Sequence, residues 1–181
     1  MKFSREKLPY CARSVFPFIK MFHVMKKILL LTIFLSNFAF ADVDLVKVKK
    51  SENRMYLLDG DTIIKEFHVA LGGHPIGHKQ QEGDQKTPEG IYTLDYKKED
   101  SSYYRAMHIS YPNAQDKANA ENLGVSPGGL IMVHGQRNRL GWLSSITQQF
   151  NWTDGCIALT NPEMDEFMSL VSVGTKIEIE W

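Results

Sequence analysis

The chain has 181 residues and a mass of 20.7 kDa, a length that suits one folded domain. Hydrophobic residues make up 43% and charged residues 23%, which excludes a disordered chain. Lys and Arg total 21, as do Asp and Glu, so the zero net charge gives no support for nucleic-acid binding, and we expect no nucleic-acid partner.

The first 41 residues differ in composition from the remainder. They carry seven basic residues and one acid, which leaves 14 basic and 20 acidic residues, a net charge of −6, on residues 42–181. Lys26 and Lys27 precede an apolar run over residues 28–35, an order typical of secretory signal peptides. The run is shorter than the roughly 20 apolar residues that a membrane-spanning helix needs. The pattern therefore predicts a leader for export.

A cleavage box follows the apolar run. Ala39-Phe40-Ala41 places small residues where a signal peptidase requires them, so we expect cleavage after Ala41 and export to the periplasm. Met25 alone begins a complete signal peptide, which makes it the expected true start within the leader, residues 1–41. An uncleaved N-terminal anchor is the alternative, and it would be the chain's only contact with a membrane. Residues 43–181 then form the folded domain, which we expect to be a monomer.

The exported part of the chain predicts a mostly β domain, with strands that carry the core. Residues 43–49 alternate apolar and charged side chains, which is typical of a half-buried strand. Asp59-Gly60 is a hairpin-turn signal between the next two strands. The predicted strands span residues 43–49, 54–58, 62–71, 90–96, 105–111, 130–134, 156–159 and 175–181.

Short helices are expected at the rim of this domain. Residues 72–90 are rich in Gly and Pro and predict a loop. The predicted helices span residues 114–122, 141–150 and 161–171. For the last of these, Asn161 is the expected N-cap and Pro162 the first helical residue.

Two segments carry residues suited to nucleophilic catalysis. The strand over residues 130–134 ends at His134, and Gly155 precedes Cys156 at the start of a later strand. Because Cys11 lies in the leader, Cys156 is the only cysteine of the exported domain and cannot form an internal disulfide. A nearby imidazole can take the proton of a thiol and make it a nucleophile. Taken separately, His134 and Cys156 are more typical of a hydrogen-bonded and a packed structural residue.

The two segments together resemble the signature of the YkuD-type L,D-transpeptidases, which are cell-wall enzymes. His134-Gly135 is followed at a distance by Thr153-Asp154-Gly155-Cys156-Ile157, which is similar to the family's histidine, spacer and Ser/Thr-x-Gly-Cys. A second block, GDQKTPEGIY over residues 83–92, resembles the family's G-D-x-x-T-P-E-G-x-Y segment. The resemblance covers nearly all of residues 43–181.

The resemblance implies a β-rich, sandwich-like catalytic domain that acts on peptidoglycan stem peptides without a cofactor. It implies that the thiolate of Cys156 attacks the carbonyl between an L-centre and a D-centre residue. His134 would act as base and then as acid, and the backbone carbonyl of Gly135 would orient the imidazole. Backbone N–H groups of Gly155 and Cys156 would form the oxyanion hole. An amine from a neighbouring stem, or water, would release the acyl-enzyme.

Two positions depart from the family pattern. Many members carry histidine where this chain has Asp154, and arginine, suited to a substrate carboxylate, where it has Ala158. The G-C-I-A segment is similar to a branch in which some members hydrolyse stem-peptide links. We therefore expect an L,D-transpeptidase, with a peptidoglycan hydrolase (an L,D-carboxypeptidase or amidase) as the alternative. A non-catalytic wall-binding module is the third hypothesis.

Several residues are candidate substrate contacts. Asp154 stands beside Cys156, and Arg137 and Arg139 have the chemistry to replace the missing arginine. Trp152, like Trp142, has the chemistry to pack over a glycan or a stem peptide, although aromatic residues beside a loop are as often core residues.

No metal is expected. His74 and His78 are four residues apart, but the glycines and the proline among them prevent a helix, and no cluster completes a ligand set. A loop histidine near the cleft is the preferred interpretation. A papain-like protease is disfavoured, because its cysteine opens a long helix near the mature N-terminus, whereas Cys156 lies near the C-terminus.

Overall fold

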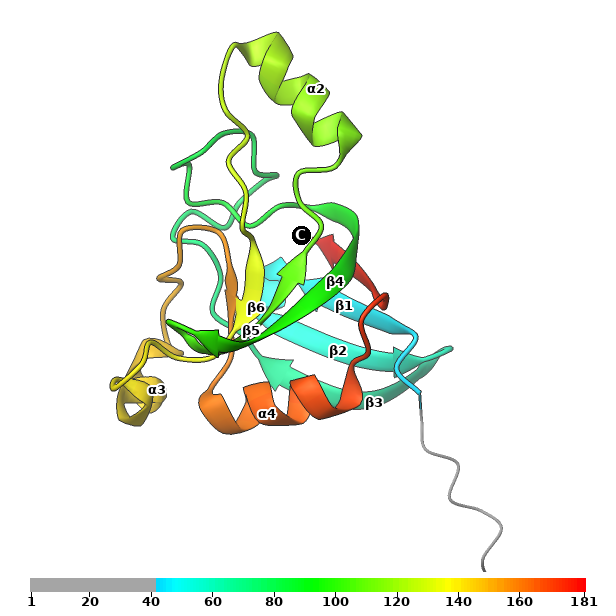
Figure 1. Ribbon diagram of the computed structural model, residues 1–181, viewed down its shortest axis with the longest axis vertical. Helices are drawn as coiled ribbons and strands as arrows, with labels where there is room; N and C mark the ends of the chain where they lie inside the picture. The colour runs from blue at the N-terminus through cyan, green and yellow to red at the C-terminus, as the bar shows by residue number, and fades with distance from the viewer. Residues whose placement is uncertain (1–41) are drawn as a thin grey trace, which may run out of the picture. The chain divides into compact units, whose positions relative to one another are not determined.

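The computed structural model describes residues 42–181, so the predicted leader, its start and its cleavage site lie outside the described residues. The described part is mostly β, as predicted, and eight strands form one mixed sheet in the order β3-β2-β1-β8-β4-β5-β6-β7 (Figure 1). The strands are β1 (Leu45–Lys49), β2 (Arg54–Asp59), β3 (Thr62–His68), β4 (Gly90–Ser101), β5 (Tyr104–Ile109), β6 (Met132–His134), β7 (Ile157–Ala158) and β8 (Lys176–Glu180).

The helices are short. They are α2 (Ala114–Leu123), α3 (Ser144–Thr147) and α4 (Asn161–Leu170), with the 3-10 turns η1 (Lys50–Glu52) and η2 (Gly141–Leu143). No helix in residues 42–181 has the length and hydropathy to cross a membrane. In Figure 1, α4 runs beneath the sheet, while α2 lies at the opposite end of the domain.

The two edges of the sheet meet at the segment that carries Cys156. The long strand β4 serves both halves of the sheet, since its first residues pair with β8 and its later residues pair with β5. Beyond β3, Ala70 bridges to Ala158 of β7, and Gly72 bridges to Thr153. Strand β7 is therefore held on one side by β6 and on the other by Ala70, and the turn before it is held at Thr153 by Gly72.

Helix α4 covers the core with Met164, Phe167 and Met168, all of them buried. Its N-cap is Thr160 and not Asn161, because Thr160 and Glu163 form a capping box in which each side chain bonds the other's backbone N–H (3.4 and 3.0 Å).

Asn161 is instead the first helical residue, and its side-chain Oδ1 accepts the Gln136 N–H at 2.8 Å. A Cβ added at Gly135 would lie 2.9 Å from the same oxygen. The residue expected to cap α4 thus anchors the backbone that follows β6.

The β4–β5 hairpin is longer than the sequence predicts. The expected strands end at residue 96 and begin at residue 105, but β4 continues to Ser101 and β5 begins at Tyr104. The charged run over residues 97–100 lacks the apolar alternation of a half-buried strand. It is a strand because its backbone pairs with β5, with Lys98 opposite Ala106 and Ser101 opposite Tyr104.

Other predicted elements are shorter in the structure, among them the strand expected over residues 62–71, which ends at His68. The strand expected over residues 130–134 begins at Met132, because Leu130 has a φ of +53° and its side chain is 73% exposed. The helix expected over residues 141–150 consists of η2 and the four residues of α3.

A buried lysine fixes the predicted loop over residues 72–90. Lys50 is 1% exposed, and its Nζ donates to the carbonyl oxygens of Gly77 (2.8 Å) and Thr87 (2.9 Å) and to Oε1 of Glu89 (3.0 Å). Burial lowers the pKa of Lys50, while Glu89 acts in the opposite direction. One side chain from η1 therefore joins the middle of the loop at Gly77 to its later end at Thr87 and Glu89.

Asp84 holds the middle of the same loop. Its carboxylate accepts hydrogen bonds from Nζ of Lys79 (2.8 Å) and from the backbone N–H groups of Gln80 (2.8 Å), Gln81 (3.1 Å) and Lys86 (3.1 Å). Asp84 of the block at residues 83–92 therefore has a structural role in fixing the loop.

We expect Lys50→Met to destabilise the domain by about 2–3 kcal/mol, because two buried carbonyls and the Glu89 carboxylate lose their donor. Urea unfolding followed by circular dichroism measures this change. Lys49→Met is the matched control, since Lys49 is an exposed neighbour that pairs with Glu52 at 3.5 Å. Equal stability of the two variants would contradict the anchoring role of Lys50.

Candidate active site

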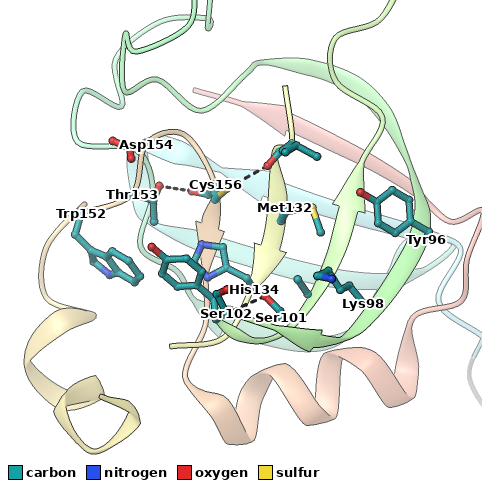
Figure 2. Close-up of a pocket in the computed structure, with 13 residues that line it drawn as sticks. Tyr96, Lys98, Ser101, Ser102, Met132, His134, Trp152, Thr153, Asp154 and Cys156 are labelled. Carbon is teal, nitrogen blue, oxygen red and sulfur yellow. Dashed lines mark hydrogen bonds between the residues drawn. The ribbon is translucent and has the colours of Figure 1, made fainter. Parts of the chain in front are cut away.

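His134 and Cys156 line one cavity of about 430 Å³ (Figure 2). The cavity lies between the β4–β5 hairpin, the start of β6 and the turn that precedes β7. Its lining residues are Tyr96, Lys98, Ser101, Ser102, Tyr103, Ala106, Leu130, Met132, His134, Trp152, Thr153, Asp154 and Cys156.

The pairing of β6 with β7 brings the two candidate catalytic residues together. The strands run parallel, with His134 opposite Ala158. Cys156 stands two residues before Ala158, as Met132 stands two residues before His134. Because side chains alternate along a strand, all four side chains belong to the same face of the sheet.

A backbone carbonyl fixes the tautomer of His134. Its Nδ1 lies 2.6 Å from the carbonyl oxygen of Gly135. A carbonyl only accepts hydrogen bonds, so Nδ1 carries the proton and Nε2 keeps its lone pair. His134 is 4% exposed, and this burial lowers its pKa to about 4, although the bond to Gly135 acts to raise it. At neutral pH the imidazole is therefore uncharged and ready to accept a proton.

Two aromatic side chains enclose the imidazole ring. The ring centroid of Tyr103 lies 4.7 Å from that of His134, and the centroid of Trp152 lies 5.8 Å from it. Tyr103 and Trp152 also stack on each other, with their centroids 6.1 Å apart. The aromatic contacts restrict the rotation of His134 and exclude water from one side of it.

The surroundings of Cys156 favour the protonated, uncharged thiol. Burial raises its pKa and the neighbouring Asp154 carboxylate raises it further, while a hydrogen bond from the Met132 backbone lowers it. The Sγ atom lies 3.7 Å from the carbonyl oxygen of Leu130, which can accept the thiol hydrogen. The positive φ of Leu130, unusual for a branched residue, orients this carbonyl. The resting pair is thus a neutral thiol beside a neutral imidazole.

The turn before Cys156 requires a glycine. Gly155 has a φ of +123°, and a Cβ there would lie 2.6 Å from the carbonyl oxygen of Lys86. Thr153 braces the same turn, because its Oγ1 accepts the Gly155 N–H (3.2 Å) and donates to the Cys156 carbonyl (2.7 Å).

The two backbone N–H groups expected to form an oxyanion hole differ in their hydrogen bonding in the structure. The Gly155 N–H is engaged by Thr153 Oγ1, as described above. The Cys156 N–H has no acceptor within residues 42–181. The Cys156 N–H is therefore the free donor beside the sulfur, and Gly155 must share or exchange its partner to contribute.

The structure brings some of the candidate substrate contacts to the cavity and leaves others outside. Asp154 and Trp152 line it. Arg137 and Arg139 are exposed residues of the segment after β6 and are not part of the lining of this cavity. Trp142 is 76% exposed on η2 and also lies outside the lining.

The loop histidines are likewise not part of the cavity lining. His78 accepts the Glu89 N–H at Nδ1 (3.0 Å), and its Nε2 lies 3.2 Å from Oδ1 of the buried Asp116. His74 is exposed. Within residues 42–181 no group of three or more His, Cys, Asp or Glu side chains is arranged to hold a metal ion.

Sequence reasoning missed the β4–β5 hairpin as a wall of the site. Tyr103 sits at its turn, and Tyr96 and Lys98 lie on β4. Tyr96 stacks on His108 (4.6 Å between centroids), whose Nδ1 contacts Asp95 at 2.7 Å. The sequence shows a run of charged residues flanked by tyrosines, but only the pairing with β5 shows which of their side chains face the cavity.

Comparisons with known proteins identify the family of this domain. Residues 43–179 match the YkuD family, the L,D-transpeptidase catalytic domain. YafK of Escherichia coli (strain K12), provisionally named as an L,D-transpeptidase, is 34% identical over 112 residues, which are 61% of this chain and 38% of YafK.

Solved structures share the fold. The helical cell shape determining protein Pgp2 of Campylobacter jejuni has a TM-score of 0.58 and 28% identity, over 75% of this chain and 46% of Pgp2. LdtMt1, solved in complex with imipenem, has a TM-score of 0.51 at 16% identity, over 77% of this chain and 59% of LdtMt1, which is a likeness of fold alone. The chain thus spans less than half the length of YafK and Pgp2.

The protonation states lead to a pH prediction. In a Cys11→Ser background, we expect alkylation of Cys156 by iodoacetamide to rise with a midpoint above about 8.5, the ordinary pKa of a cysteine thiol. Asp154→Asn should lower that midpoint, because it removes a negative charge that opposes ionisation. Asp61→Asn, at the exposed β2–β3 turn, is the control. A midpoint far below 8.5 would instead indicate a standing thiolate–imidazolium pair.

Proposed function

The chain belongs to the YkuD family of L,D-transpeptidase catalytic domains, and we propose that it is a peptidoglycan L,D-transpeptidase that forms an acyl-enzyme on Cys156. One observation carries this proposal: a neutral imidazole, with Nδ1 held by the Gly135 carbonyl, shares a cavity with the single thiol of the described residues. This arrangement supplies a nucleophile and its base without a metal.

The first step is attack on the carbonyl between an L-centre and a D-centre residue of a stem peptide. The Cys156 thiol gives its proton to Nε2 of His134 as the sulfur bonds the carbonyl carbon. The imidazolium that forms is stabilised by its hydrogen bond to the Gly135 carbonyl. The carbonyl oxygen becomes an oxyanion, and the Cys156 N–H is positioned to donate to it, joined by Gly155 when Thr153 releases that N–H.

The second step expels the D-residue. The proton on His134 Nε2 passes to the departing amine as the carbon–nitrogen bond breaks, which leaves a thioester on Cys156 and a neutral imidazole. An amine from another stem peptide then loses its proton to His134 and attacks the thioester, so that a new amide forms and the thiol is restored. Burial of the imidazole keeps it neutral and able to accept a proton in both half-reactions.

Hydrolysis is the second candidate, and the position of Ala158 favours it. Ala158 stands opposite His134, is fully buried and bonds Ala70 through its backbone. Strand β7 therefore supplies no cation to bind a carboxylate of an acceptor stem peptide. If water replaces the amine, the same thioester yields a carboxylic acid, and the enzyme is an L,D-carboxypeptidase or an amidase.

The biological setting follows from the proposed substrate. Peptidoglycan lies outside the cytoplasmic membrane, so we propose that the domain acts in the periplasm after export through its N-terminal leader. A role in cell-wall remodelling and cell shape is supported by the likeness to Pgp2, named for helical cell shape determination. We propose that it acts as a monomer, since one chain carries the nucleophile and the base.

We expect Cys156→Ala and His134→Ala each to lower acyl-enzyme formation by at least about 10³-fold while circular dichroism spectra stay unchanged. Intact-protein mass spectrometry with disaccharide-peptides, or with a carbapenem as the acylating agent, measures the adduct, which should map to Cys156. His74→Ala, which changes an exposed loop histidine, serves as the control. Full adduct formation in either catalytic variant would contradict the mechanism.

The nature of the acceptor has its own test. In a digest of disaccharide-peptides with excess D-amino acid, we expect exchange products or cross-linked dimers, because an amine should intercept the thioester. Mass spectrometry of the products distinguishes these from trimmed stems. Trimmed or detached stems without incorporation of the amine would rule out the transferase and support the hydrolase.

A further inference from the structure

The cavity around Cys156 carries opposite charges at its two ends. Asp154 lies on the cysteine turn, whereas Lys98 lies on β4, on the far side of Cys156 and His134 (Figure 2). Among the described residues that line the cavity, Lys98 is the only lysine or arginine and Asp154 is the only carboxylate. A peptide across the cavity therefore meets a cation at one end and an anion at the other.

Strand register places Lys98 in line with the candidate base. Lys98 stands opposite Ala106 of β5, and Ala106 stands opposite His134 of β6. Neighbouring strands are about 4.8 Å apart, so the Cα atoms of Lys98 and His134 are about 10 Å apart. The residue between them contributes only a methyl group, which leaves the space above it open to a ligand.

Lys98 is available to bind a ligand. Its Nζ lies 3.2 Å from Oδ1 of Asp100, but the Asp100 side chain is 92% exposed. An ion pair between two exposed side chains contributes little, since water competes with it. The ammonium of Lys98 can therefore leave Asp100 for a carboxylate bound inside the cavity.

We propose that Lys98 binds a carboxylate of the substrate and so sets the direction in which the stem peptide lies across Cys156. The inference rests on the proposed function, in that the ligand is a stem peptide with a free carboxylate near the reacting bond. Asp154 favours the same orientation of the peptide, because it repels a carboxylate at the opposite end of the cavity. Two sources share this chemistry: the terminal carboxylate of the departing D-residue, and a side-chain carboxylate of the donor stem.

The test measures binding without turnover. In a Cys156→Ala background, calorimetry at low salt compares three synthetic stem peptides: one with both carboxylates free, one with a terminal carboxamide and one with a side-chain carboxamide. We expect Lys98→Gln to weaken binding of the first peptide about tenfold. The same substitution should leave unchanged the affinity for the peptide that lacks the recognised carboxylate, which identifies the source. Lys98→Arg should retain binding.

Controls separate this proposal from the proposed reaction. Lys117→Gln removes an exposed lysine of α2 and should not alter affinity. Higher salt should reduce the difference between the Lys98→Gln variant and its parent, since exposed charges are screened. Equal binding by the Lys98→Gln variant, or no binding of any stem peptide, overturns the assignment of Lys98.

The two proposals fail in different ways. Binding that depends on Lys98, together with no acyl-enzyme in the chain with Cys156 intact, supports the carboxylate site and refutes the reaction. Acyl-enzyme formation with an unchanged KM in the Lys98→Gln variant supports the reaction and refutes the site. A raised KM with an unchanged kcat supports both.

Discussion

The packing of Gly155 against the Lys86 carbonyl is the contact on which the rest of the site depends. A side chain at 155 would displace the loop over residues 72–90 or the cysteine turn. The loop makes a second close approach, since a Cβ at Gly72 would lie 2.2 Å from the Gln85 carbonyl oxygen and 3.1 Å from the Gly155 Cα atom. The buried Lys50 in turn fixes the loop by donating to the carbonyl oxygen of Thr87. The backbones of the loop and of the cysteine turn therefore pack directly on each other at Gly72 and Gly155, which fixes the position of the turn that carries the sulfur.

Burial determines the chemistry of the pair more than its sequence motif does. A low pKa for His134 and a raised pKa for Cys156 both favour uncharged groups. Charge then appears only during attack, when the substrate carbonyl and its oxyanion are present to stabilise it. A protonated thiol also reacts slowly with oxidants, which suits a single cysteine proposed to work in an oxidising compartment.

Local pattern was sufficient to predict most strands of the core and to single out His134 and Cys156, which share the cavity. The alternation in β1 reports a constraint that acts within a few residues, whereas the contact that requires a glycine at position 155 comes from Lys86, far away in the sequence. The site's far wall could not be predicted in this way, because Lys98 and Tyr103 owe their positions to cross-strand register and to a two-residue turn. The cap of α4 was also missed: the side chain of Asn161 bonds Gln136, a tertiary contact that local pattern does not reveal. The hydrogen bond from the Gly155 N–H to Thr153, which competes with a role in an oxyanion hole, is likewise not visible in the motif.

The parallel pairing of β1 with β8 has a consequence for how the chain folds. Leu45 stands opposite Lys176, and Lys49 stands opposite Glu180, so the first strand of the domain, which pairs with β2 on one side, finds its second partner only in β8. Such non-local pairing gives a high contact order and slow folding. Because β8 also pairs with β4, the hairpin strands β1 to β3 join the rest of the sheet only after residues 176–180 have been synthesised.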